Sequence, residues 1–211
     1  MTLPFRAFGR GSLRVAPVGL RAGLLPERWP ALAEGLPRPL VVSAGVCGGL
    51  HPRLAPGDLV VPDRVIGPAG ERFDLEPSVH RATVFRGAAS VHGGCLVTTH
   101  EVAATAEAKA ALRARTGAVA VDMESAAILG AAREAGWPGL VVRGVSDSAA
   151  QAVPSELMRL VGVDGRLGLA GAVALVLTQP RAIPRAIELG RGTRQALRAV
   201  ARALAVLARP E

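Results

Sequence analysis

The chain has 211 residues and a mass of 21.6 kDa, enough for one domain whose core needs neither disulfide nor metal. Half of the residues are hydrophobic and 20% are charged, which excludes an intrinsically disordered protein. The net charge of +8 does not indicate nucleic-acid binding, because the basic residues are spread along the chain and aromatic residues make up only 3%. Lys109 is the only lysine.

Apolar runs and turn residues predict alternating strands and helices in the first half of the chain. Strands are expected at residues 13–18, 40–44 and from 58, with a helix at 26–34. A further helix is expected at 77–89, followed by a strand at 95–99.

The second half continues the alternation, with helices at 103–115 and 123–135 and strands at 118–122 and 140–146. The run at 167–178 predicts a buried helix, because it is too short to cross a bilayer. These elements predict an α/β fold with three layers, α/β/α, around a central mixed sheet. We expect one domain over residues 1–211, with 181–211 as a basic helical extension at the C-terminus.

The cysteines and the N-terminus predict a reduced, cytoplasmic protein. Cys47 and Cys95 lie in apolar segments, and the first residues lack the long apolar region of a signal peptide. The four histidines lack the spacing of metal ligands, so no metal site is expected. No cofactor is expected either.

Polar residues cluster at three junctions, where a predicted strand ends and the following segment begins. The segments are SAGVCGGLHP after the strand ending near Ala44, DMES after Val121, and VSDSA after Val145. Ligands of open α/β sheets bind at the carboxyl ends of strands, so these junctions predict one site. Each junction also has a structural interpretation. In this interpretation the glycines form a tight turn, Asp122 and Glu124 complement a helix dipole, and Asp147 belongs to a turn or cap.

The three segments together resemble the superfamily of purine nucleoside phosphorylases and methylthioadenosine/S-adenosylhomocysteine nucleosidases. The resemblance rests on GVCGGLHPRLAPGDLVVPD, AVAVDMESAAIL and VVRGVSDSA, in that order, over residues 13 to about 150. The short length, VPSELMRLVGVDGR and the arginine-rich tail look most like the hopanoid-associated phosphorylases. The resemblance implies a nucleoside phosphorylase-like fold, a homo-oligomer, and an enzyme that cleaves the N-glycosidic bond of a purine nucleoside.

The resemblance also implies roles for particular residues. Glu124 would bind the sugar hydroxyls and steady positive charge on the ribosyl group, and Met123 would pack against the sugar. Asp147 would protonate purine N7 as a general acid, oriented by Ser146 or Ser148. Gly48 is a further substrate-binding candidate.

Two departures from the family pattern leave the reaction open. The first strand of the family, which carries either a water-activating glutamate or a phosphate loop, is unrecognisable. Arg21 is the candidate phosphate ligand, and both hydrolysis and phosphorolysis stay open. The aromatic residue expected to stack on the purine is replaced by Val102.

Several hypotheses about the function therefore remain open. The first is cleavage of the N-glycosidic bond of a purine nucleoside, with an adenosyl-hopane intermediate as one candidate substrate. A nucleosidase of a soluble substrate such as methylthioadenosine is an alternative. A catalytically weak nucleoside-binding protein and a membrane-peripheral scaffold are the others. On a helix over 193–208, an apolar stripe opposes a basic side. It either packs on the domain or gives peripheral contact with the inner face of the membrane. The stripe is Leu197, Val200, Leu204 and Leu207, and the basic side is Arg194, Arg198, Arg202 and Arg209.

Overall fold

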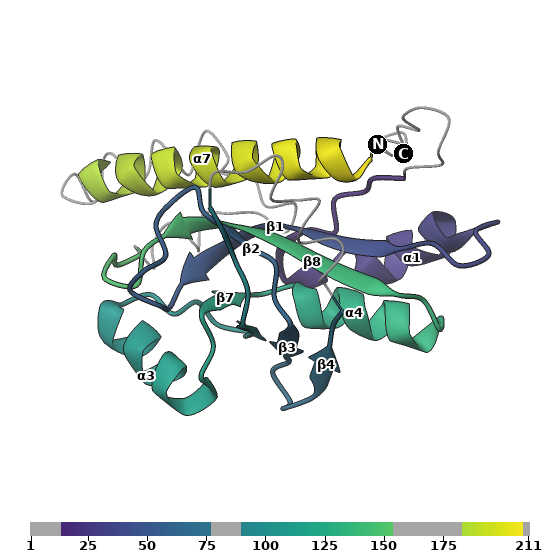
Figure 1. The fold of residues 1–211 in the computed structure, drawn as a ribbon, viewed down its shortest axis with the longest axis horizontal. Helices are drawn as coiled ribbons and strands as arrows, with labels where there is room; N and C mark the ends of the chain where they lie inside the picture. Colours follow the sequence, from purple (N-terminus) through teal and green to yellow (C-terminus); the bar gives the residue numbers. More distant parts are fainter. Residues whose placement is uncertain (1–13, 77–89, 154–182, 209–211) are drawn as a thin grey trace.

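The computed structural model describes residues 14–76, 90–153 and 183–208. The predicted helices at 77–89 and 167–178 lie outside these residues. The described elements form three layers, with α7 on one face of a sheet and α3 and α4 on the other (Figure 1). The predicted α/β/α architecture with a mixed sheet is confirmed.

Eight strands form the sheet in the order β4-β3-β6-β7-β1-β8-β2-β5. Their bounds are β1 Val41–Gly49, β2 Leu59–Val60, β3 Arg64–Ile66, β4 Arg72–Asp74, β5 Val91–His92, β6 Cys95–Thr98, β7 Ala120–Asp122 and β8 Gly139–Asp147. The two long strands, β1 and β8, run parallel along the centre, while β7 pairs with β1 in the antiparallel sense.

The helices cover the sheet from both sides, and their bounds are η1 Leu20–Ala22, α1 Leu25–Ala33, α3 Ala106–Thr116, α4 Ser125–Glu134 and α7 Ile183–Leu207. Helix α3 is capped at its N-terminus by Thr105, whose hydroxyl accepts the amide hydrogen of Ala108, and at its C-terminus by the left-handed Gly117. No described helix combines the length and the apolar character needed to span a membrane.

Alternation along β8 divides the core between the two faces of the sheet. Leu140 and Val142 pack with Ala199, Val200 and other residues under α7. Val141 and Val145 lie in the cluster that includes Ala126 and Leu129 of α4. By the same alternation, Arg143 lies on the α4 side and Gly144 on the α7 side.

The predicted strand at residues 13–18 is wrong in its described part, because residues 14–19 have neither helix nor strand. The Arg14 guanidinium instead donates to the carbonyls of Ala31, Leu32 and Glu34 at the end of α1. Pro17 offers no amide hydrogen for a ladder. The segment is therefore held against a helix end and not by a neighbouring strand.

The tight turn considered for the glycines after Ala44 is also wrong, since β1 continues through Gly49. A Cβ on Gly45 would lie 2.3 Å from Nη1 of Arg143, and one on Gly48 would lie 3.1 Å from Oδ2 of Asp147. These glycines let two charged side chains approach the strand.

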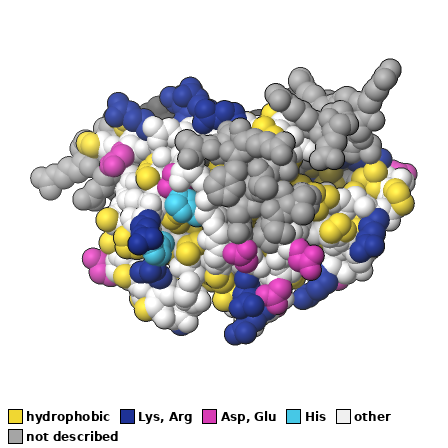
Figure 2. Space-filling view, in the orientation of Figure 1, with side chains coloured by type: hydrophobic (Ala, Val, Ile, Leu, Met, Phe, Trp, Pro, Cys, Tyr) yellow, Lys and Arg dark blue, Asp and Glu magenta, His cyan; other side chains and the backbone are white. Residues whose placement is uncertain are grey.

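Helix α7 packs on the domain, one of the two alternatives for the tail. Val200, Leu204 and Leu207 of the predicted stripe contact the sheet core, whereas Leu197 is 51% exposed. The side chains of Arg194, Arg198 and Arg202 are exposed, and Figure 2 shows basic side chains along the edge of the molecule over α7. The helix is thus part of the core packing of the domain.

Two glycines of α7 offer a matched test of this packing. A Cβ on Gly192 would lie 2.0 Å from the carbonyl oxygen of Ser146, whereas one on Gly190 would meet nothing within 4 Å. We expect Gly192→Ala to lower the free energy of unfolding by about 1–3 kcal/mol, the usual cost of overpacking. Gly190→Ala should be neutral or raise it by about 1 kcal/mol, because alanine favours a helix. Urea denaturation checks both, and equal stabilities for the two variants would contradict this packing of α7.

Candidate active site

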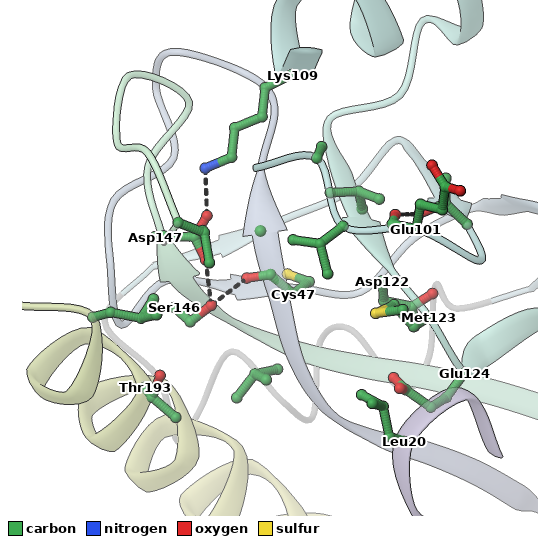
Figure 3. Close-up of a pocket in the computed structure, with 18 residues that line it drawn as sticks. Leu20, Cys47, Glu101, Lys109, Asp122, Met123, Glu124, Ser146, Asp147 and Thr193 are labelled. Carbon is green, nitrogen blue, oxygen red and sulfur yellow. Dashed lines mark hydrogen bonds and ion pairs between the residues drawn. The ribbon is translucent and has the colours of Figure 1, made fainter. Parts of the chain in front are cut away.

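A pocket of about 220 Å³ lies where β1, β7 and β8 end. Its walls come from these strands, the loop after β6, and α3, η1 and α7 (Figure 3). The lining residues are Leu20, Val46, Cys47, Gly48, Thr99, Glu101, Val102, Ala103, Lys109, Val121, Asp122, Met123, Glu124, Ser146, Asp147, Val153, Leu189 and Thr193. The three polar junctions of the sequence therefore meet at one pocket.

The pocket brings together nearly all of the predicted site residues. Glu124, Asp147, Met123, Ser146, Gly48 and Val102 all line it. Figure 3 shows Asp147 and Ser146 at one end, and Glu124 and Met123 at the other. Two carboxylates are therefore available at separate ends of one cavity. The catalytic and binding roles given to these residues stay predictions.

Arg21 is the candidate that the structure places differently. Its side chain is exposed and does not line the pocket, although the preceding Leu20 does. What Arg21 brings to the site is its backbone amide, which donates to Oε1 of Glu124 at 3.1 Å. The residue has φ of 54°, an uncommon left-handed conformation for a side chain of this size. This conformation accompanies an amide hydrogen aimed at the Glu124 carboxylate.

Asp147 is buried, and each of its carboxylate oxygens has a protein partner. The residue is only 4% exposed, and its Oδ2 forms an ion pair with the Lys109 ammonium. Its Oδ1 lies 2.6 Å from Oγ of Ser146, whose hydroxyl is also 3.1 Å from the carbonyl of Cys47. Of the two serines considered for orienting Asp147, Ser146 makes the side-chain contact. Ser148 contributes a carbonyl that accepts from Lys109.

Asp122 has the structural role that the sequence allowed for it. Its Oδ1 accepts from the Thr98 hydroxyl at 2.7 Å, and its Oδ2 accepts from the Ser125 amide at the start of α4. The Arg143 guanidinium also lies 2.8 Å from Oδ2. With its hydrogen-bonding positions taken by protein groups, Asp122 fixes the β7–α4 junction.

Glu124 differs, although it stands at the N-cap position of the same helix. Its side chain makes no capping hydrogen bond to the helix. Arg143, whose guanidinium is shared with Asp122, is 3.5 Å from Oε2. Burial raises the pKa of Glu124 above its ordinary 4.5, with Arg143 opposing and Asp122 reinforcing this shift. Of Asp122, Glu124 and Asp147, Glu124 therefore has the least compensated carboxylate.

Arg143 was missed by the sequence analysis. It is 3% exposed, and its guanidinium also donates to the hydroxyls of Ser43 and Ser125 at 2.9–3.2 Å. A buried arginine with four polar partners is an anchor for the acidic junction. Only its place in VVRGVSD, four residues before Asp147, signalled it in advance.

Lys109 and the α7 residues Leu189 and Thr193 were also missed. Lys109 stands in the middle of a helix whose sequence suggests an exposed surface, and only its being the single lysine sets it apart. Nothing in the sequence indicates that α7 returns to the pocket. The glycines of the tail permit this, because Gly192 allows the helix to approach the backbone of Ser146 closely.

The chain is similar to known proteins in its sequence and its fold. Residues 31–166 match the family model described as the phosphorylase superfamily. The futalosine hydrolase of Streptomyces coelicolor is 30% identical over 206 residues, covering 77% of this chain and 88% of that protein.

Solved structures of two nucleosidases share the fold. The methylthioadenosine/S-adenosylhomocysteine nucleosidase of Neisseria meningitidis matches with a TM-score of 0.64 and 19% identity, over 92% of this chain and 78% of that chain. The futalosine hydrolase of Helicobacter pylori matches with a TM-score of 0.62 and 18% identity, over 90% and 75%. The nucleoside phosphorylase-like fold predicted from the sequence is confirmed. By its family model and by its identity to a relative over most of both chains, this chain belongs to the phosphorylase superfamily.

Proposed function

We propose that the chain is an enzyme that breaks the N-glycosidic bond of a purine nucleoside, and that the attacking nucleophile is water. The observation that carries the proposal is the pocket itself, with Glu124 and Met123 at one end and Asp147 and Ser146 at the other (Figure 3). Breaking this bond leaves positive charge on the sugar and negative charge on the departing base. The two ends of the pocket are suited to these two charges.

Glu124 suits the sugar end. Its side chain is 17% exposed, and the nearest cation, Arg143, is 3.5 Å away and shared with Asp122. A largely buried negative charge that is only partly compensated gains most when a cation forms beside it, so it stabilises the transition state over the substrate. Met123 adds an apolar, polarisable surface against the sugar.

Asp147 suits the base end. The purine leaves as an anion unless a proton reaches it, and a carboxyl group in contact with N7 is a route for that proton. Val102 and Val153 line the same pocket and give a flat base apolar surface, in place of the aromatic side chain expected in the family.

Hydrolysis is favoured over phosphorolysis by the charges around the pocket. Within the described residues, the cationic side chain that lines it is Lys109, whose ammonium already binds Asp147 and two carbonyls. The Arg21 guanidinium does not line it. A phosphate ion needs cationic or amide donors, whereas water does not. The relative from Streptomyces coelicolor is likewise a hydrolase by name.

The experiment is product analysis with the purified protein. Futalosine, methylthioadenosine and adenosine are incubated separately, with and without phosphate, and both the free base and the sugar product are quantified. We expect base and free sugar at a rate that phosphate does not change. A sugar 1-phosphate formed only with phosphate would replace hydrolysis by phosphorolysis. No base from any substrate would favour the nucleoside-binding protein instead.

The finer predictions from the sequence stay predictions: an adenosyl-hopane substrate, a homo-oligomer, and peripheral membrane contact through residues 181–211. The apolar side of α7 gives the lipid substrate no support, because Val200, Leu204 and Leu207 contact the sheet core. A water-soluble nucleoside is therefore the substrate that we propose to test first.

The raised pKa of Glu124 predicts the acid limb of the pH profile. Glu124 steadies the sugar cation only when ionised, so kcat/KM should fall on acidification with a midpoint above 4.5, the ordinary value for this carboxyl. A p-nitrophenyl riboside isolates this limb, because its leaving group needs no proton. Since the folded protein binds this proton more tightly than the unfolded chain, protonation of Glu124 does not itself destabilise the fold. A midpoint at or below 4.5 would contradict the assignment.

A further inference from the structure

Lys109 lies beside the proposed acid with every donor in use. Its side chain is 1% exposed, and its ammonium donates to Oδ2 of Asp147 (Figure 3). It also donates to the carbonyls of Ser148 and Gln151 at 2.7 and 2.8 Å. An ammonium has three N–H donors, so each has a protein acceptor. This arrangement fixes the rotamer of the lysine and the position of the Asp147 carboxylate.

Stability alone gives little reason for a buried lysine at this place. Taking an ammonium and a carboxylate out of water costs free energy that their attraction repays only in part. Replacing a buried ion pair by apolar residues is often neutral or stabilising. The neighbouring Leu112 shows that this side of α3 packs well with an apolar residue. An apolar pair in place of Lys109 and Asp147 would therefore serve the fold.

The ion pair also bears on the chemistry proposed for Asp147. Within the pair, Asp147 is a carboxylate, and its two oxygens face Lys109 and Ser146. A carboxylate has no proton to give. The ammonium in contact with it has three, and it is the nearest cation to this end of the pocket among the described residues.

We propose that Lys109 is the source of the proton that the departing purine receives, and that it acts through Asp147. This inference rests on the proposed function. An N–H bond of Lys109 breaks, and its proton passes to the Asp147 carboxylate. As the bond from C1′ to N9 breaks, its electron pair goes to the purine, and Asp147 passes this proton to N7. Lys109 is left as a neutral amine, which water reprotonates after the base has left.

Lys109→Met tests this step, because methionine keeps the length of the side chain and removes the proton. We expect kcat on a purine nucleoside to fall by about 10²- to 10⁴-fold, the usual contribution of a general acid. KM should change little, because substrate binding does not use the lysine. The rate on a p-nitrophenyl riboside should stay within a few-fold of wild type. Arg113→Met, which removes an exposed charge from the same helix, is the matched control and should leave both rates unchanged.

A double variant shows whether Lys109 and Asp147 act in one proton transfer or contribute to the rate independently. If Lys109 acts through Asp147, Lys109→Met with Asp147→Asn should be no slower on the purine than Asp147→Asn alone. The double variant should also melt at a higher temperature than Asp147→Asn, because it no longer buries an unpaired ammonium.

Three results with Lys109→Met would overturn the inference. These are a Lys109→Met enzyme that keeps its rate on purines, one that loses equally on both leaving groups, or a loss that multiplies with that of Asp147→Asn. A Lys109→Arg enzyme as fast as wild type on purines would also contradict it, because a guanidinium does not give up its proton. Each of these results leaves the proposed function intact, provided that the wild-type protein releases base. If wild type releases none, the proposed function fails first.

Discussion

Replacing Glu124 by glutamine is expected to lower kcat for base release by about 10²- to 10³-fold, the usual loss when one charge-stabilising group is removed from an active site. Glutamine preserves the shape and the acceptor for the Arg21 amide but removes the negative charge. The loss should be similar on a purine nucleoside and on a p-nitrophenyl riboside, because both pass through the same sugar cation. Steady-state kinetics on both substrates measures it.

The fold should survive this change. Glu124 makes no capping bond to α4, and Asp122 still pairs with Arg143. Glu134→Gln removes an exposed carboxylate near the other end of the helix and serves as the control. A Glu124→Gln enzyme as active as that control would mean that Glu124 does not stabilise the sugar cation.

Replacing Asp147 by asparagine should have the second large effect, and one that depends on the leaving group. Without a carboxyl group at this end of the pocket, no proton reaches N7, and kcat on purine nucleosides should fall by about 10²- to 10⁴-fold. A p-nitrophenyl leaving group is stable as an anion, so its release should change only a few-fold. The ratio of the two rates is the measurement.

The ratio matters because Asp147→Asn also disturbs the fold. It leaves the Lys109 ammonium buried without its anionic partner, and breaking a buried ion pair typically costs about 3–5 kcal/mol. A loss of folded protein would lower both rates together, whereas a loss of the acid lowers only one. Equal losses on both substrates, with circular dichroism unchanged, would remove Asp147 from the acid role.

The sequence predicted the layers of the fold because each depends on local patterns. Strands β6, β7 and β8 and helices α3 and α4 lie within a few residues of their expected places, since apolar periodicity and capping residues act over short distances. The strand expected at 13–18 was wrong because its apolar residues alternate like a strand, while a distant helix end holds Arg14.

The sequence predicted most of the candidate residues that line the pocket, but not the cations that pair with its carboxylates. Glu124 and Asp147 were identified because the motifs around them resemble a family, although composition alone gave each carboxylate a structural interpretation. Arg143 and Lys109 were missed, because a cation that pairs with a carboxylate across the fold leaves no mark in its own segment. The glycines of β1 were taken for a turn because a glycine has no signature that separates a bend from the close approach of another chain segment.

The C-terminal segment also has contacts that its own sequence pattern does not predict. Its stripe of apolar residues was correctly read as a helix, yet an amphipathic helix looks alike whether it covers a sheet or a membrane. The backbone of Ala196 lies close to Gly144, and this contact between distant segments exists only once the chain has folded. The pattern of either segment alone does not predict it.

A crystal structure with a C-nucleoside analogue of adenosine tests the central claim most directly, because the carbon–carbon glycosidic bond is not cleaved and the complete ligand stays in place. We expect both ribose hydroxyls within hydrogen-bonding distance of Glu124, the sugar against Met123, and N7 of the base on Asp147. An analogue bound in this pocket with its base at Glu124, or bound elsewhere on the protein, would contradict the assignment of the two ends.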